Sequence, residues 1–133
     1  MPPVVTGQAT LHVGVATALE GRSPSRSFST VFEDDGQTGY FYGLDLGRSD
    51  QPIVDAMHIY TVAGVIDRDK PSLIQITWSS DGWKAALLVN SYTHAIFDFE
   101  ERRGYCRTNF PKRIGYWTTF DHAWSDEAMD LLR

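Results

Sequence analysis

The chain has 133 residues, of which 42% are hydrophobic, and a formal net charge of −5. This size suits one domain, residues 1–133, with a single buried core. The acidic balance argues against nucleic-acid binding by the surface as a whole, and no apolar run approaches the ~20 residues of a membrane span. Cys106 is the one cysteine, and no cationic segment precedes an apolar one at the N-terminus. We therefore expect a cytoplasmic protein without disulfides.

The first segment with a pattern is residues 11–16. Leu11, Val13 and Val15 alternate there with polar or small residues. A period of two is typical of a strand with one buried face, so this segment predicts a first strand of modest strength. The polar residues 20–27 that follow are interpreted as a loop.

Two aromatic-rich runs come next, at residues 28–32 and 39–44. The connection between them, residues 33–37, includes an Asp-Gly pair, which favours a tight turn. Two apolar runs joined in this way predict a β-hairpin.

Residues 53–66 allow two interpretations. Pro52 suits the first position of a helix, which would place Ile53, Met57 and Tyr60 on one face. The β-branched and aromatic residues in the middle of the same segment favour a strand equally well. Both structures remain open, including a helical turn that leads into a strand.

Residues 73–100 carry the clearest strand pattern of the chain. Ile74, Ile76 and Trp78 alternate with polar residues, which predicts a strand with one buried face. Residues 79–82 end in glycine and predict a turn. The segment as a whole is expected to form a three-stranded antiparallel meander.

The middle strand of this meander, residues 83–89, is apolar on both sides of its alternation apart from Lys84. Strands covered on both faces have this composition, so we expect residues 83–89 to be the central strand. In the third strand, Ala95, Phe97 and Phe99 are expected to share the buried face.

Residues 124–133 have the signals of a short helix that docks on the sheet. Ser125 is a suitable N-cap, and Trp124 could pack against Met129 across the first turn. Together these elements predict an α+β fold, built mostly of antiparallel β-sheet with a short C-terminal helix packed on one face.

The most distinctive charge pattern is the basic segment, residues 102–113, which holds five of the twelve Lys and Arg residues and no acid. Cations interleaved with aromatic residues are typical of surfaces that bind phosphate or single-stranded nucleic acid. Pairing of the arginines with nearby acids would be the purely structural explanation. The candidate binding residues are Arg102, Arg103, Tyr105, Arg107, Lys112 and Arg113.

Catalytic groups are harder to find. Cys106 lies among cations that would favour a reactive thiolate, but no histidine is close to it in sequence. The four histidines, at positions 12, 58, 94 and 122, lack the spacing of a zinc site even when Asp55 is considered with the second of them. We therefore expect no metal, no cofactor and no catalytic residue. Whether the protein is an enzyme stays open, and the sequence favours a protein that is not one.

Several stretches of the sequence resemble a family of small bacterial proteins classed as a domain of unknown function. The resemblance covers roughly residues 28–128 and implies a soluble, bacterial, single-domain protein. It implies no activity, ligand or catalytic residue. The segments that carry it are GYFYGLD (39–45), DAMHIYTV (55–62), SSDGWKAALLVN (79–90) and RRGYCRTNFP (102–111).

These features favour a non-enzymatic binding protein that masks a partner protein, as the immunity proteins of bacterial toxin systems do. One alternative is a binder of nucleic acid or of a phosphate-bearing ligand through residues 102–113. A second alternative is a cysteine-dependent enzyme centred on Cys106. The sequence indicates no membrane partner and does not indicate the oligomeric state.

Overall fold

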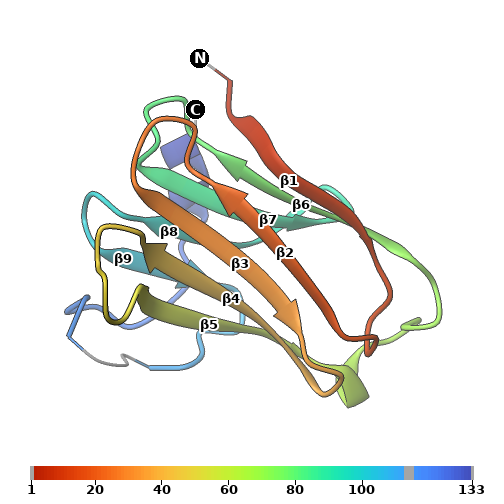
Figure 1. The fold of residues 1–133 in the computed structure, drawn as a ribbon. Coiled ribbons are helices and arrows are strands. Elements are labelled where there is room, and N and C mark those ends of the chain that lie inside the picture. The colour runs from red at the N-terminus through yellow and green to blue at the C-terminus, as the bar shows by residue number, and fades with distance from the viewer. Residues whose placement is uncertain (1, 113–115, 133) are drawn as a thin grey trace.

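The computed structural model describes residues 2–112 and 116–132, which form a sandwich of two antiparallel β-sheets (Figure 1). The first sheet has the strand order β1-β6-β7-β8-β9 and the second has the order β2-β3-β4-β5. The strands of the first sheet are β1 (Val4–Leu11), β6 (Ser72–Trp78), β7 (Lys84–Val89), β8 (Tyr92–Asp98) and β9 (Arg103–Cys106). Those of the second are β2 (Thr17–Arg22), β3 (Phe28–Asp34), β4 (Thr38–Asp45) and β5 (Ile53–Thr61). The antiparallel fold class is therefore confirmed.

The predicted meander forms β6, β7 and β8, with β7 third of the five strands in its sheet. Leu87 of β7 is fully buried in the core between the sheets, whereas its neighbour Ala86 is buried on the opposite face, against the C-terminal helix. The expectation of a central strand covered on both faces is confirmed.

Aromatic side chains from both sheets fill the space between them. Phe41 of β4 meets Phe97 of β8 with ring centroids 5.3 Å apart. Trp78 of β6 stacks on Phe99 at 5.3 Å and donates its indole N–H to the carbonyl of Gly21 in β2 at 3.0 Å. The Phe41–Phe97 contact and the hydrogen bond from Trp78 to Gly21 each connect one sheet to the other, and the Trp78–Phe99 stack packs beside them. These contacts therefore join the two sheets.

The outer face of the first sheet carries the C-terminal helix η2 (Asp126–Leu132), a 3₁₀-helix (Figure 1). Ala128 and Leu132 of η2 pack on Ala86 and Ile96 of the sheet. The docked helix predicted from residues 124–133 is confirmed. In the described residues, no helix has the length and apolar content needed to cross a membrane.

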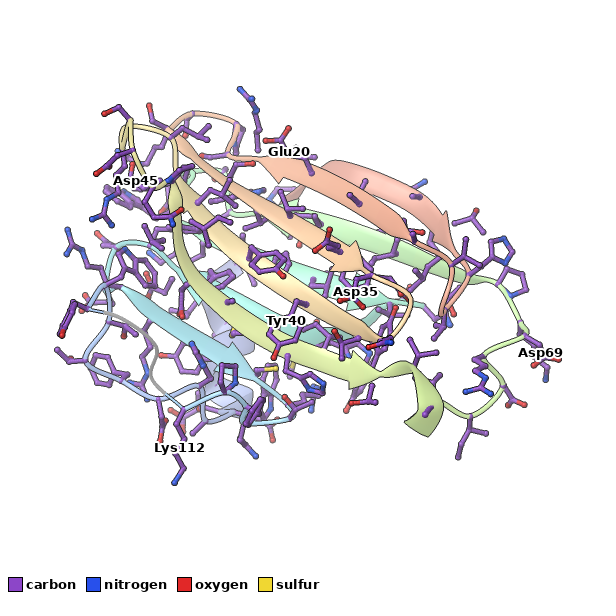
Figure 2. The ribbon with its side chains drawn as sticks, turned by 60° about the horizontal axis from the view of Figure 1, so that its bottom comes forward. Glu20, Asp35, Tyr40, Asp45, Asp69 and Lys112 are labelled. Carbon is purple, nitrogen blue, oxygen red and sulfur yellow. The ribbon has the colours of Figure 1, made fainter. Side chains whose placement is uncertain are left out.

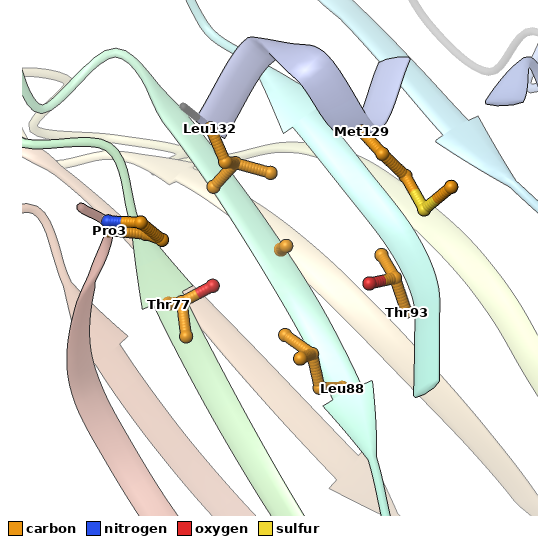
Figure 3. A pocket seen from close by; sticks show the side chains of 7 residues that line it. Pro3, Thr77, Leu88, Thr93, Met129 and Leu132 are labelled. Atoms are coloured by element: carbon orange, nitrogen blue, oxygen red, sulfur yellow. The ribbon is translucent and has the colours of Figure 1, made fainter. Parts of the chain in front are cut away.

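A shallow groove of about 330 Å³ lies beside η2 on this outer face (Figure 3). Thr77 and Thr93 contribute its polar atoms, and apolar side chains form the rest of its wall. The described residues that line it are Pro3, Thr77, Ala86, Leu88, Thr93, Met129 and Leu132.

The strand predicted over residues 11–16 is wrong. Leu11 is the last residue of β1, and residues 12–16 turn the chain from the first sheet into the second. Gly14 adopts a φ of 89° and donates its N–H to the carboxylate of Asp34 at 2.7 Å. Val13 still packs on the core, so the apolar alternation comes from a turn rather than from a strand.

The loop predicted over residues 20–27 is correct only in its second half, because β2 continues to Arg22. Gly21 lies so close to Ile76 of the opposite sheet that a Cβ atom would come within 2.5 Å of its side chain. This close approach explains why a glycine interrupts the strand pattern here.

The segment 53–66 begins with strand β5, so the helical interpretation of its first nine residues is wrong. A single 3₁₀ turn, η1 (Val62–Gly64), follows the strand rather than leading into it. Met57 of β5 is fully buried and pairs with Phe41 of β4. The β-branched and aromatic residues of this segment favour the strand over the helix that Pro52 suggests.

Candidate functional site

Four hairpin connections among the described residues meet at one end of the sandwich, which we call the loop end (Figure 1). They meet because each joins antiparallel neighbours within one sheet, and the two sheets are stacked with these connections on the same side. Loops carried on a rigid sandwich are a common place for binding residues. The connections are residues 23–27, 46–52, 79–83 and 99–102.

Contacts between loops of different sheets hold this end together. Ser23 donates its hydroxyl to the carbonyl of Gly82 at 3.0 Å, and Arg26 donates its Nε–H to the carbonyl of Asp81 at 2.8 Å. The guanidinium of Arg26 also lies 4.0 Å from the ring centroid of Trp83. The loop end is therefore preorganised by the fold.

An aromatic cleft of about 240 Å³ opens between these loops. Phe28 stacks on Phe99 at 4.7 Å, and Trp117 meets Phe99 edge-on at 5.7 Å. Asp45, which Figure 2 labels at this end, belongs to the polar side of the cleft. The lining among the described residues is Phe28, Asp45, Trp83, Phe99, Glu100, Arg102 and Trp117.

A second pocket of about 260 Å³ shares Arg102 and Trp117 with the aromatic cleft. We call it the arginine pocket, because the described residues that line it include Arg48 and Arg102 and no acid. Within residues 2–112 and 116–132, the side chains of Arg48 and Arg102 form no ion pair or hydrogen bond. The lining residues are Arg48, Ile53, Val54, Arg102, Tyr116 and Trp117.

Three acids in or next to these loops have hydrogen-bond or ion-pair partners. Glu100 receives a salt bridge from Lys84 with an Nζ to Oε1 distance of 2.7 Å. Asp45 accepts the backbone N–H of Gly47 at 3.0 Å. Asp98 is buried and accepts two backbone N–H groups from the turn that precedes Arg102, at 3.0 and 3.1 Å. These carboxylates shape the loops rather than line the arginine pocket.

The backbone of Arg102 is in the left-handed region, with a φ of 53°. This conformation costs an L-residue with a Cβ atom about 1 to 2 kcal/mol relative to glycine. Strained residues of this kind cluster at functional sites. An arginine is present where a glycine would fit more easily, which favours a role for its side chain.

Replacing Arg102 with glycine is expected to raise the free energy of unfolding by up to ~1 kcal/mol, because the left-handed conformation suits glycine. Replacing it with alanine removes the same side chain and keeps the strain, so Arg102→Ala is the matched control. Chemical denaturation of both variants measures the difference. A glycine variant less stable than the alanine variant would contradict the strain argument.

The structure divides the predicted basic segment between different surfaces. Arg102 is at the loop end, whereas Arg103 projects from β9 onto the outer face of the first sheet. The guanidinium of Arg103 lies 4.8 Å from the ring of Tyr105 and 4.2 Å from that of Phe120. Lys112 is exposed at the lower edge of Figure 2, and Arg113 lies outside the described residues.

Arg107 also lies on the outer face and is held by several contacts. Its guanidinium is 4.2 Å from the ring of Tyr92 and 4.1 Å from that of Trp124. Its Nε–H donates to the carbonyl of Thr93 at 2.6 Å, and one Nη atom lies 4.0 Å from a carboxylate oxygen of Asp126. Arg107 therefore fastens the segment before η2 to the sheet.

Cys106 is buried and faces the core from β9. Its sulfur lies 3.1 Å from the backbone carbonyl of His58 and 3.2 Å from the hydroxyl of Thr108. Burial raises the pKa of the thiol, and hydrogen bonding to Thr108 lowers it only in part. This arrangement does not assemble the exposed thiolate and base that the cysteine-enzyme hypothesis needs.

A buried pair that sequence reasoning missed joins His122 to Asp55, with 2.8 Å between Nε2 and Oδ2 and both side chains fully buried. The Nδ1 of His122 is hydrogen-bonded to the carbonyl of Pro111. Both ring nitrogens face acceptors, an arrangement that the doubly protonated, charged imidazole satisfies. Burial opposes this charge, but the hydrogen bond and negative charge of Asp55 outweigh it and raise the pKa of His122 above its ordinary 6.5.

This pair fastens His122, in the connection between β9 and η2, to Asp55 of the edge strand β5. Asp55 and His122 are 67 residues apart, so no local spacing could have revealed the contact. Along the same edge, His58 of β5 donates its backbone N–H to Phe110 at 2.9 Å. Among residues 2–112 and 116–132, no three His, Cys, Asp or Glu side chains come together as metal ligands would.

Residues 11–133 match a bacterial protein family described as "Uncharacterized protein conserved in bacteria (DUF2251)". The chain belongs to this family. This confirms the resemblance to a bacterial domain of unknown function. An "Uncharacterized protein" of Haemophilus influenzae is 42% identical to the chain over 93 residues, which cover 68% of this chain and 58% of the relative. The match thus spans less than two thirds of that relative's length. No solved structure matches this member of the DUF2251 family.

Proposed function

We propose that this member of the DUF2251 family is a non-enzymatic binding protein that attaches to a partner protein through its loop end. The observation that carries the proposal is the gathering of aromatic, aliphatic and arginine side chains on and beside the interlocked loops of this end. Tyr116 is 99% exposed, and Ile53 is 46% exposed beside the unpaired Arg48 and Arg102. Tyr, Trp and Arg are the residues that most often dominate binding at protein interfaces.

Two further observations support binding rather than catalysis. The Cys106 thiol is buried, and burial raises its pKa. His122 is fully buried and engaged at both ring nitrogens. These two side chains serve the packing of the protein. We therefore propose that the protein acts by covering a surface of its partner, as the immunity proteins of bacterial toxin systems do.

The geometry favours the loop end over the basic segment as the binding surface. A nucleic-acid or phosphate surface along residues 102–113 needs its cations to be free and to face the same way. Arg103 and Arg107 are instead stacked on aromatic rings of the outer face, while Arg102 points to the loop end.

Site-specific photo-crosslinking in the native bacterium tests the proposal. A photoreactive phenylalanine analogue at position 116 is expected to give a protein adduct that mass spectrometry identifies. The matched control is the same analogue at Ala63, which is exposed on η1 at the other end of the sandwich. An absence of adduct at position 116, or the same adducts from both positions, would refute the proposal.

A further inference from the structure

We infer that the arginine pocket binds a carboxylate group that is attached to an aromatic or aliphatic group, as in an acidic residue beside an apolar one on the partner protein. The inference rests on the proposed function, which supplies the partner, and it assigns the chemistry that this pocket recognises. It is carried by three features of the pocket: its unpaired cations, its apolar wall and its rigid support.

The pocket contains two arginine side chains. Arg48 and Arg102 line one pocket. Among the described residues, no acid lines this pocket and neither guanidinium has an ion-pair partner. Like charges held together repel each other, and an anion placed between them removes that repulsion. Guanidinium groups present paired N–H donors that match the two oxygens of a carboxylate. On a chain with a net charge of −5, a pocket lined by two arginines that have no ion-pair partner among the described residues is therefore suited to an anion.

The apolar wall selects what the anion is attached to. Ile53 and Tyr116 are exposed there, and Val54 and Trp117 lie behind them. A free inorganic anion would leave this apolar surface in water. A carboxylate joined to an aromatic or aliphatic group would cover it and gain hydrophobic stabilisation as well as the charge contacts.

Each sheet supplies one guanidinium from a supported loop. Arg48 belongs to the connection after β4, where Leu46 donates its backbone N–H to Ser27 at 2.8 Å. Arg102 belongs to the turn after β8, which the carboxylate of Asp98 holds through two backbone hydrogen bonds. The strained φ of Arg102 fixes the direction in which its side chain leaves this turn. Such support lowers the entropic cost of binding, because the loops are already ordered before the ligand arrives.

Binding of phenylacetate to the full chain tests the inference directly. Two-dimensional NMR of the Arg Nε–H and Trp indole N–H groups should show saturable shifts at Arg48, Arg102 and Trp117. Benzyl alcohol, which keeps the ring and lacks the charge, should give no such shifts. Arg48→Gln and Arg102→Gln should each weaken phenylacetate binding about tenfold, since each removes one charge-assisted contact. Arg68→Gln, an exposed arginine at the other end of the sandwich, is the matched control and should bind normally.

The same variants, carrying the photoreactive analogue at position 116, connect the pocket to the partner. Loss of the adduct in Arg48→Gln and Arg102→Gln, but not in Arg68→Gln, supports a carboxylate supplied by the partner. An adduct that survives both substitutions overturns the inference and leaves the proposed function standing. Saturable phenylacetate binding without any adduct in the unsubstituted pocket upholds the carboxylate site and refutes the partner protein. Absence of saturable phenylacetate binding, or equal binding of benzyl alcohol, overturns the inference.

Discussion

Replacing Asp55 with alanine is expected to lower the free energy of unfolding by about 3 to 5 kcal/mol, because it leaves a fully buried histidine without its counter-ion. The carboxylate of Asp55 accepts from His122 at 2.8 Å and from the backbone N–H of Ala56 at 3.0 Å. Neither donor can turn to water, since both lie in the interior. Chemical denaturation at pH 6 measures the loss.

The dependence of this loss on pH gives an independent check. The pKa of His122 is raised in the folded protein, so the folded state keeps a proton that the unfolded state releases above its ordinary value of 6.5. The stabilisation is complete below that value and declines as the pH rises through the raised pKa. Loss of the carboxylate should therefore cost less at alkaline pH than at pH 6.

Asp69→Ala is the matched control for this experiment. Asp69 lies in the exposed connection between η1 and β6 (Figure 2), where substitutions usually change stability by less than about 0.5 kcal/mol. A loss below about 1 kcal/mol in the Asp55 variant, or the same loss at both pH values, would show that the pair does not stabilise the fold as described.

Truncating Leu87 to alanine is expected to cost about 2 to 5 kcal/mol, because it leaves a cavity between the sheets that the surrounding strands can fill only in part. Leu87 is fully buried on the central strand, directly between Ile76 of β6 and Ala95 of β8 in the register of the sheet. Denaturation by urea measures the change in stability.

Leu73→Ala provides the comparison of like with like. Leu73 is 38% exposed at the beginning of β6 and should lose clearly less stability. If the two leucine variants unfolded at the same denaturant concentration, Leu87 could not be part of the core.

The meander could be predicted from sequence because its strands are neighbours in the chain, its first strand alternates regularly from Ile74 to Trp78, and turn residues separate the strands. The start of the fold could not, because β1 and β2 belong to different sheets. Val13 is apolar because it packs on the core from a turn, and position 21 is a glycine because the two sheets come close together there. Contacts of this kind form only when the two sheets are stacked, so the local sequence does not indicate them.

The same limit applies to the candidate site. Counting charges identified the segment that contains Arg102, but it could not separate this residue from Arg103 and Arg107, whose aromatic partners come partly from distant positions. Arg48 carried no sequence signal at all, because it stands alone in its loop. It joins Arg102 only through the stacking of the two sheets.

The residues between β9 and η2 that the structure describes bear on how the protein resists aggregation. Strands β5 and β9 are the last strands of their sheets, and the backbone N–H of His58 on one and of Cys106 on the other is bonded to this covering segment. Uncovered edges of this kind recruit strands from other molecules and seed aggregates. The buried Asp55–His122 pair thus holds the covering residues in place, and its loss would expose both strand edges to pairing with strands of other molecules.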